Sequence, residues 1–183
     1  MKSRKAQFWS FDALFAMIIF TAAVLIATDV WYNVSNQFAV SYGYGVGNME
    51  MQLNSFSIQL LGTGYPSNWD SQISISNTLT WHNISIGLGN QNNGFASSSL
   101  SESKVMALYG MSNYNYQATK AQLGLSYDYY ITFSGSGVDL SIGKNPLSSG
   151  ATAIEVSNRF VTLDNKTVEM RVLVWTNTTF GVS

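Results

Sequence analysis

The chain has 183 residues, of which 46% are hydrophobic and only 10% are charged, with a formal net charge of −1 and no cysteine. This length suits one domain with a sizeable core and a separate anchoring helix. The small net charge, without a basic stripe, argues against nucleic acid as a partner. The lack of cysteine excludes disulfides and thiolate metal sites.

The N-terminus combines a basic leader with an apolar segment. Lys2, Arg4 and Lys5 are a third of all the lysine and arginine in the chain, and from Phe8 to Thr28 the only charge is Asp12. As a helix this segment spans about 30 Å, the thickness of the hydrocarbon core of a bilayer. Because the basic residues precede the span, the N-terminus is expected on the cytoplasmic side and the rest of the chain outside.

Three interpretations of this segment compete: a cleaved signal peptide, a permanent single-pass anchor, and a helix that is retained for assembly. No A-x-A-like site closes the apolar run, and the helical pattern continues past it, which disfavours a cleaved signal peptide. A permanent anchor does not explain Asp12, since a carboxylate at the bilayer centre costs roughly 2.5–3.5 kcal/mol, and less near the interface. Asp12 is therefore either a headgroup-level residue without a special partner or a carboxylate that gains a cation on assembly.

The stretch from Arg4 to Ala16 reads RKAQFWSFDALFA, and it resembles the class III signal peptide of archaeal type IV pilins. The resemblance implies that a prepilin peptidase removes the leader and that the helix stays on the mature chain. A cut after Ala6 keeps the Gln with which mature chains of the family usually begin, and a cut after Gln7 makes Asp12 the fifth mature residue. The expected cleavage region is Lys5, Ala6, Gln7 and Phe8.

The same resemblance implies a role for the acid in the helix. In that family an acidic residue about five positions into the mature chain pairs with the new α-amino group of a neighbouring subunit. Ser10 and Asp12 keep the mutual spacing of the family pattern. The matching acid here is Asp12. Phe15 and Ala16 are the other expected assembly residues, and Ala16 is one of the small residues expected to pack closely between helices.

Helical spacing continues beyond the bilayer. The glycines at 43–47 predict a kink or a short melted stretch. After them one apolar stripe follows a helical period and is expected to pack against the globular domain; it consists of Val46, Met49, Leu53, Phe56 and Leu60. Glycine and proline at 62–66 end the helix. Residues 60–69, LLGTGYPSNW, and two later stretches, SESKV at 101–105 and LGLSYDYY at 123–130, also resemble archaeal pilin-like proteins.

Short helices and then strands are predicted for the rest of the chain. Ser99 and Glu102 form a capping box for one helix, and Asn115 caps a second helix that runs to Gly124. Residues 90–99 are expected to be a loop. Alternating apolar residues predict strands at 127–133, 138–142, 151–163 and 167–180, the last two joined as a hairpin at 164–166.

These elements predict an α+β fold, in which a long N-terminal hydrophobic helix precedes a small globular domain with short helices and an antiparallel sheet. The expected organisation is a leader at 1–7, a long helix at 8–61 that spans the membrane to about residue 28, and an extracellular head at 62–183.

The sequence offers no complete catalytic or metal site. His82 is the only histidine and lacks a nucleophile elbow near it. No calcium loop or phosphate-cradling glycine loop is present. No enzyme activity, cofactor or metal is therefore expected. Four sequons are candidate N-glycosylation sites, and all lie on the side predicted to be outside: Asn33, Asn83, Asn165 and Asn177.

The sequence therefore favours a structural subunit of a type IV pilus-like extracellular filament. Its expected partners are copies of itself or related pilins, prepilin peptidase and the pilus assembly machinery, and membrane lipid before assembly. It is expected first in the cell membrane and then at the cell surface. The alternative is a non-assembling, membrane-anchored binding protein whose sheet is the functional part. An exported enzyme is the weakest hypothesis.

Overall fold

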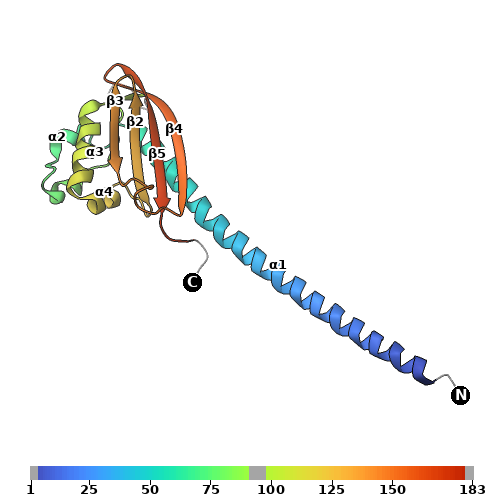
Figure 1. Cartoon of the computed structure of the whole chain (residues 1–183). Helices are drawn as coiled ribbons and strands as arrows, with labels where there is room; N and C mark the ends of the chain where they lie inside the picture. The colour runs from blue at the N-terminus through green and yellow to red at the C-terminus, as the bar shows by residue number, and fades with distance from the viewer. Residues whose placement is uncertain (1–3, 91–97, 180–183) are drawn as a thin grey trace. The chain divides into compact units, whose positions relative to one another are not determined.

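The structure is a computed structural model that describes residues 4–90 and 98–179, with side chains over residues 11–35, 45–90 and 98–179. The chain divides into two compact units, one up to Tyr44 and one from Gly45. Helix α1, Arg4–Leu61, runs from the first unit into the second (Figure 1). It is assigned without interruption across residues 43–47, so the predicted melted stretch is absent, and the kink stays a prediction.

The second unit, here called the head, is built on the last part of α1. Met49, Leu53, Phe56 and Leu60 are almost fully buried, as their helical spacing predicts. Burial of such side chains stabilises a fold by about 1.5–3 kcal/mol each. Because these residues are part of the core, the compact unit begins at Gly45, earlier than the head predicted to start at residue 62.

Four short helices follow α1: α2 at Trp69–Gln72, the 3-10 helix η1 at Thr78–Trp81, α3 at Glu102–Tyr114 and α4 at Tyr116–Gln122. The predicted cap of α4 is confirmed, because the Asn115 side chain accepts a hydrogen bond from the Ala118 N–H at 3.0 Å. The predicted capping box of α3 is wrong. Ser99 lies in a strand, and Ser101 occupies the N-cap position without a side-chain cap bond.

The head contains a five-stranded sheet in the order β1-β4-β5-β2-β3. The strands are β1 Ser99–Leu100, β2 Asp128–Gly135, β3 Val138–Gly143, β4 Ala153–Leu163 and β5 Lys166–Thr176. The α+β prediction is confirmed, but the sheet is mixed, not purely antiparallel. Strand β1 pairs in parallel with the end of β4, through Ser99 with Thr162 and Leu100 with Leu163.

Helices α3 and α4 lie on one face of the sheet (Figure 1). The residues of β2 and β5 that point to this face are buried, as strict alternation along a strand requires. They form one core with the α1 stripe, and the Phe56 and Tyr129 rings meet edge to face at 6.0 Å. The buried strand residues on this face are Tyr129, Ile131, Phe133, Val168, Met170, Val172 and Val174.

The predicted hairpin joins β4 and β5. Asp164 and Asn165 both have positive φ, of 49° and 59°, which is the backbone of a two-residue type I′ turn. Asx residues tolerate this left-handed conformation better than other non-glycine residues. The turn fixes the register, so that Leu163 lies opposite Lys166 and the pairing continues to Ala153 and Thr176.

Candidate functional site

The first candidate site is the apolar stretch of α1. Residues Phe11–Ser35 form a segment of 25 residues that contains an 18-residue window with a mean hydropathy of 2.3, and none of that window is buried within the chain. At 1.5 Å per residue the segment is about 37 Å long, enough to cross the hydrocarbon core. The apolar segment thus runs past residue 28, and the predicted end of the membrane span near that residue stays a prediction. A single N-terminal helix of this kind is consistent with membrane anchoring or with a signal sequence.

Polar side chains in this stretch bond to the helix itself. The Thr21 hydroxyl donates to the Met17 carbonyl at 2.7 Å, and the Thr28 hydroxyl donates to the Val24 carbonyl at 2.5 Å. Near its end the Asn33 amide donates to the Asp29 carbonyl at 3.0 Å. Such local bonds lower the cost of placing polar groups in lipid, where water cannot satisfy them.

Asp12 lies near the start of the stretch. It is exposed, and neither ion pair recorded among the described residues involves it. Phe15 and Ala16 follow at three and four positions, so all three share one face of the helix. The phenyl ring of Phe15 is 60% exposed. The predicted assembly positions therefore form one exposed surface that the chain itself does not cover.

The predicted cleavage region lies in the first turns of the same helix. Lys5, Ala6, Gln7 and Phe8 belong to α1, which is assigned from Arg4 onward. Their side chains lie outside the described residues. Cleavage at either predicted bond stays a prediction.

The stretch at 60–69, which resembles pilin-like proteins, contains the end of α1 and connects it to a neighbouring segment by hydrogen bonds. Carbonyl groups of Leu60 and Gly62 accept hydrogen bonds from the N–H groups of Leu88 and Gly89, both at 2.8 Å. The Trp69 indole, which is fully buried, donates to the Gly87 carbonyl at 2.8 Å. A Cβ at position 87 would overlap the backbone at Gly62. The segment thus holds the helix end against residues 85–89 and has a structural role.

Lys104 is a buried lysine that the sequence reasoning missed. It is 2% exposed, and its Nζ donates to the carbonyls of Thr63 at 2.7 Å and Gly89 at 2.9 Å. Burial lowers the pKa of the Lys104 ammonium, and the nearby charge of Asp70 raises it. The available signal was its spacing from Leu108 and Met111, which places a charged residue on the buried stripe of α3.

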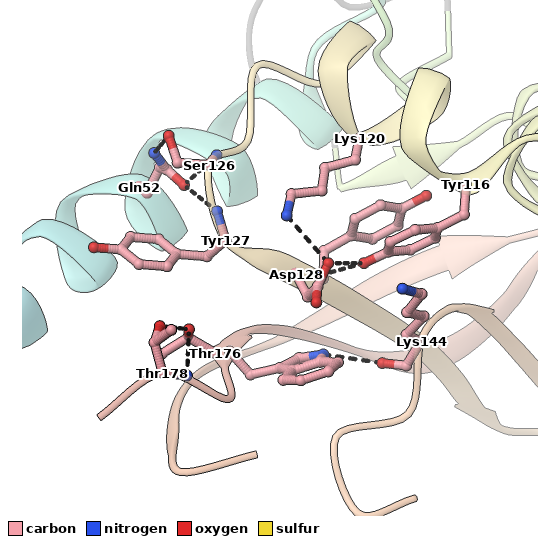
Figure 2. A network of polar contacts seen from close by, with 11 residues as sticks. Gln52, Tyr116, Lys120, Ser126, Tyr127, Asp128, Lys144, Thr176 and Thr178 are labelled. Atoms are coloured by element: carbon pink, nitrogen blue, oxygen red, sulfur yellow. Dashed lines mark hydrogen bonds and ion pairs between the residues drawn. The ribbon is translucent and has the colours of Figure 1, made fainter. Parts of the chain in front are cut away.

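A polar network surrounds the start of β2, as Figure 2 shows. The Asp128 carboxylate accepts from the Tyr116 hydroxyl at 3.0 Å and from the Lys120 ammonium at 3.1 Å. The Tyr116 hydroxyl in turn accepts from the Tyr129 N–H at 3.0 Å. The two tyrosine rings stack at 5.1 Å, and the Lys144 Nζ lies 4.6 Å from the Tyr116 centroid. The network joins α4 to β2 and to the segment after β3.

Both tyrosines of this network hold their protons strongly. Burial raises the pKa of Tyr129 to about 12, and burial also raises the pKa of Tyr116 above its usual value. At neutral pH both hydroxyls are therefore neutral hydrogen-bonding groups. This chemistry suits a structural connection between helix and sheet, not a general base.

The raised tyrosine pKa values predict a loss of stability at alkaline pH. The contribution of the two tyrosines to the free energy of unfolding is complete below the pKa of about 10 that they have in the unfolded chain. Below this pH the tyrosines are protonated in both the folded and the unfolded chain. The contribution falls as the pH rises from 10 towards 12, because the unfolded chain loses protons that the folded chain keeps. Urea unfolding of the full chain in detergent should show this fall, and Tyr129→Phe should make it smaller.

The control for this measurement is Tyr65→Phe, because Tyr65 is 74% exposed. That variant should keep the alkaline slope of the parent chain. An equal slope in Tyr129→Phe and in the parent chain would show that Tyr129 does not carry the effect.

An open groove of about 380 Å³ lies beside the network and is lined by Asn48, Met51, Gln52, Ser55, Ser126 and Tyr127. The Gln52 side-chain oxygen accepts from the N–H of Ser126 at 3.0 Å, and its amide donates to the Ser126 hydroxyl at 3.2 Å (Figure 2). These contacts connect α1 to the chain that enters β2. The amide and hydroxyl lining suits a neutral polar ligand.

The four sequon asparagines are all exposed: Asn33, Asn83, Asn165 and Asn177. Asn165 lies in the hairpin turn and Asn33 in the apolar stretch of α1. His82 is also exposed, next to the buried Trp81. Across residues 4–90 and 98–179 no three His, Asp or Glu side chains group in a way that suits a metal ion.

Comparisons with protein-family models, with curated proteins and with solved structures found no match.

Proposed function

We propose that this protein is a structural subunit of a type IV pilus-like extracellular filament. The observation that carries the proposal is the apolar stretch Phe11–Ser35, which is entirely uncovered by its own chain and continues in the same helix into the core of the head. An apolar surface of this extent requires lipid or protein around it. A helix that stays attached to the head can leave lipid and pack against the helices of other subunits.

Helix packing would drive this exchange. Lipid and a helix bundle are both apolar, so the hydrophobic effect contributes little to it. Close packing at small side chains and the pairing of Asp12 with a new α-amino group supply the preference for the bundle. The small residues are Ala13, Ala16, Ala22, Ala23 and Ala27.

The proposal implies a sequence of partners and locations. The precursor inserts in the membrane, prepilin peptidase removes the leader, and the assembly machinery adds the subunit to other copies or to related pilins. The head then faces the outside of the cell. Asn83, Asn165 and Asn177 are exposed on the head and are the accessible candidates for glycosylation, whereas Asn33 would be covered in the assembly.

The mature N-terminus tests the proposal. Mass spectrometry of the native protein should find a chain that starts at Gln7 or Phe8, and size analysis should find it in high-mass polymers. A native chain that starts beyond residue 28 would show that the helix is discarded, and the proposal would be wrong.

The second candidate function is a membrane-anchored binding protein at the cell surface. The groove beside Gln52 favours it, because amides and hydroxyls next to an aromatic residue suit a sugar or another neutral polar ligand. It shares the membrane helix but needs no assembly. A chain that is uncut, or that is monomeric in native membranes, would favour this function over the filament.

A further inference from the structure

Among residues 4–90 and 98–179, strand β4 has an open edge over most of its length. It lies at the margin of the sheet (Figure 1), where β1 covers only Thr162 and Leu163. Within residues 4–90 and 98–179, no backbone hydrogen bond reaches that edge between residues 154 and 160. An exposed edge presents unpaired N–H and C=O groups that can pair with another strand.

The direction of these groups follows from the pairing of Thr162. Its N–H donates to the Ser98 carbonyl, on the side of β4 away from β5. Backbone groups point to alternate sides at successive residues. The N–H and C=O groups of Ile154, Val156, Asn158 and Phe160 therefore point outward along the open edge.

All four residues point their side chains to the solvent face of the sheet, and three of these side chains are apolar. Ile154 is 39% exposed, Val156 is 47% exposed and Phe160 is 77% exposed. The charged residues of the segment, Glu155 and Arg159, are half-buried and point to the other face. The Nε of Arg159 is buried and has no hydrogen-bond partner among the residues that the structure describes.

We infer that the β4 edge pairs antiparallel with β4 of a second copy of this chain, about a two-fold axis at Ser157. This register places Glu155 opposite the Arg159 of the second copy, and Ile154 opposite its Phe160. It also places Val156 opposite Asn158. All outward-pointing backbone groups then meet outward-pointing groups, which gives about eight main-chain hydrogen bonds.

The sequence of β4 favours this register over its neighbours. A shift of the axis by one residue to either side keeps the backbone groups matched but places Glu155 and Arg159 opposite uncharged residues. Opposite charges and aromatic–aliphatic pairs stabilise facing strands. The second copy also places a carboxylate opposite the charged Arg159 side chain. Inward-pointing charges disfavour pairing with a strand that lacks the opposite charges at the facing positions. This edge therefore selects a strand that places opposite charges against Glu155 and Arg159.

This inference uses residues of the head alone and does not rest on the proposed filament. A two-fold contact is closed and joins two chains only. The pairing and helix-driven polymerisation can therefore be separated experimentally.

Disulfide trapping tests the inference, because the native chain has no cysteine. In the proposed register the two Ser157 residues form a non-hydrogen-bonded pair with a Cα separation of about 4.5 Å, within the range of about 4.4–6.8 Å for a disulfide. Full-length Ser157→Cys, purified in detergent and mildly oxidised, should run mainly as a disulfide-linked dimer. The matched control is Ser141→Cys, an exposed residue of β3, which should stay monomeric.

A mixed experiment tests the register. Glu155→Cys and Arg159→Cys should give little cross-link alone and a heterodimer when mixed. Asp12→Ala combined with Ser157→Cys should still give the dimer, whatever happens to filaments. Equal cross-linking at positions 157 and 141, or none at 157, would overturn the inference, as would a cross-link of Ser157→Cys only to a protein of another mass.

Charge exchange gives an independent check. Glu155→Arg alone and Arg159→Glu alone should each weaken the dimer roughly tenfold in sedimentation experiments in detergent, because each places like charges opposite one another. The double variant Glu155→Arg with Arg159→Glu should restore the affinity of the parent chain. If both single variants dimerise like the parent chain, the register is wrong; if the double variant is no better than the single variants, the charge pairing is wrong.

Discussion

Replacing Asp12 by alanine is expected to leave membrane insertion intact and to abolish filament formation. Insertion does not need the carboxylate, because an acidic side chain within an apolar span only adds to the cost of entering lipid. Assembly needs it, since the carboxylate is the group that pairs with the α-amino group of a neighbouring mature chain. Electron microscopy of cells, with the amount of membrane-bound protein measured in parallel, should show normal insertion and no filaments.

Asp29→Ala is the matched control for this experiment. Asp29 is the other acid within the same apolar stretch, and it is also exposed. It lies 17 residues after Asp12 and is not the position that the family resemblance pairs with an α-amino group, so its replacement should leave filaments unchanged. Normal filaments from Asp12→Ala would refute the assembly role of this carboxylate, and loss of filaments in both variants would indicate a general effect on the helix.

Lys104→Met is expected to destabilise the head by about 2–4 kcal/mol. The methionine keeps most of the apolar stem but removes the donor to two carbonyls, those of Thr63 and Gly89. The bond to the Gly89 carbonyl is buried and the bond to the Thr63 carbonyl is part-buried, and leaving a buried carbonyl without a donor costs about 1–3 kcal/mol. The lost charge offsets part of this, because burial already disfavours the ammonium. Urea unfolding of the full chain in detergent measures the difference.

The control for Lys104 is Lys166→Met. Lys166 begins β5 beside the hairpin turn and is exposed, so its replacement should change the free energy of unfolding by less than about 0.5 kcal/mol. A Lys104→Met chain as stable as the parent would show that water or backbone movement satisfies the two carbonyls, and that Lys104 does not hold the helix end.

The elements that were predicted well are specified by local signals. The α1 stripe at Met49, Leu53, Phe56 and Leu60 follows a helical period, and Asn115 caps α4 through its own side chain. Alternation in β2 predicted Tyr129, Ile131 and Phe133 on the buried face. Each of these features depends on residues within a few positions of one another, so the sequence pattern carries them directly.

The elements that were missed depend on distant parts of the chain. Strand β1 has two residues in a serine-rich stretch and exists because β4 offers backbone groups to it. The capping box at Ser99 was wrong for the same reason, since pairing with Thr162 commits that residue to a strand. The bonds from Lys104 to Thr63 and Gly89 join three segments that only the fold brings together.

The candidate site was predictable in part. The apolar stretch and the common face of Asp12, Phe15 and Ala16 follow from composition and spacing alone. The network around Asp128 was not predicted, because it needs α4 to lie next to the start of β2. The open edge of β4 was also beyond sequence reasoning, since it follows from the strand order and from the short pairing with β1.

The continuity of α1 has a mechanical consequence. A force that pulls on the N-terminal segment reaches the head through the helix that carries Leu53 and Phe56, at the centre of the core and not at its rim. The hydrogen bonds that the Leu88 and Gly89 N–H groups donate to the carbonyls of Leu60 and Gly62, at and just after the end of α1, bear part of this force. Extraction of the helix therefore removes Leu53 and Phe56 from the core, and the head should resist traction through the packing of these side chains as well as through backbone bonds.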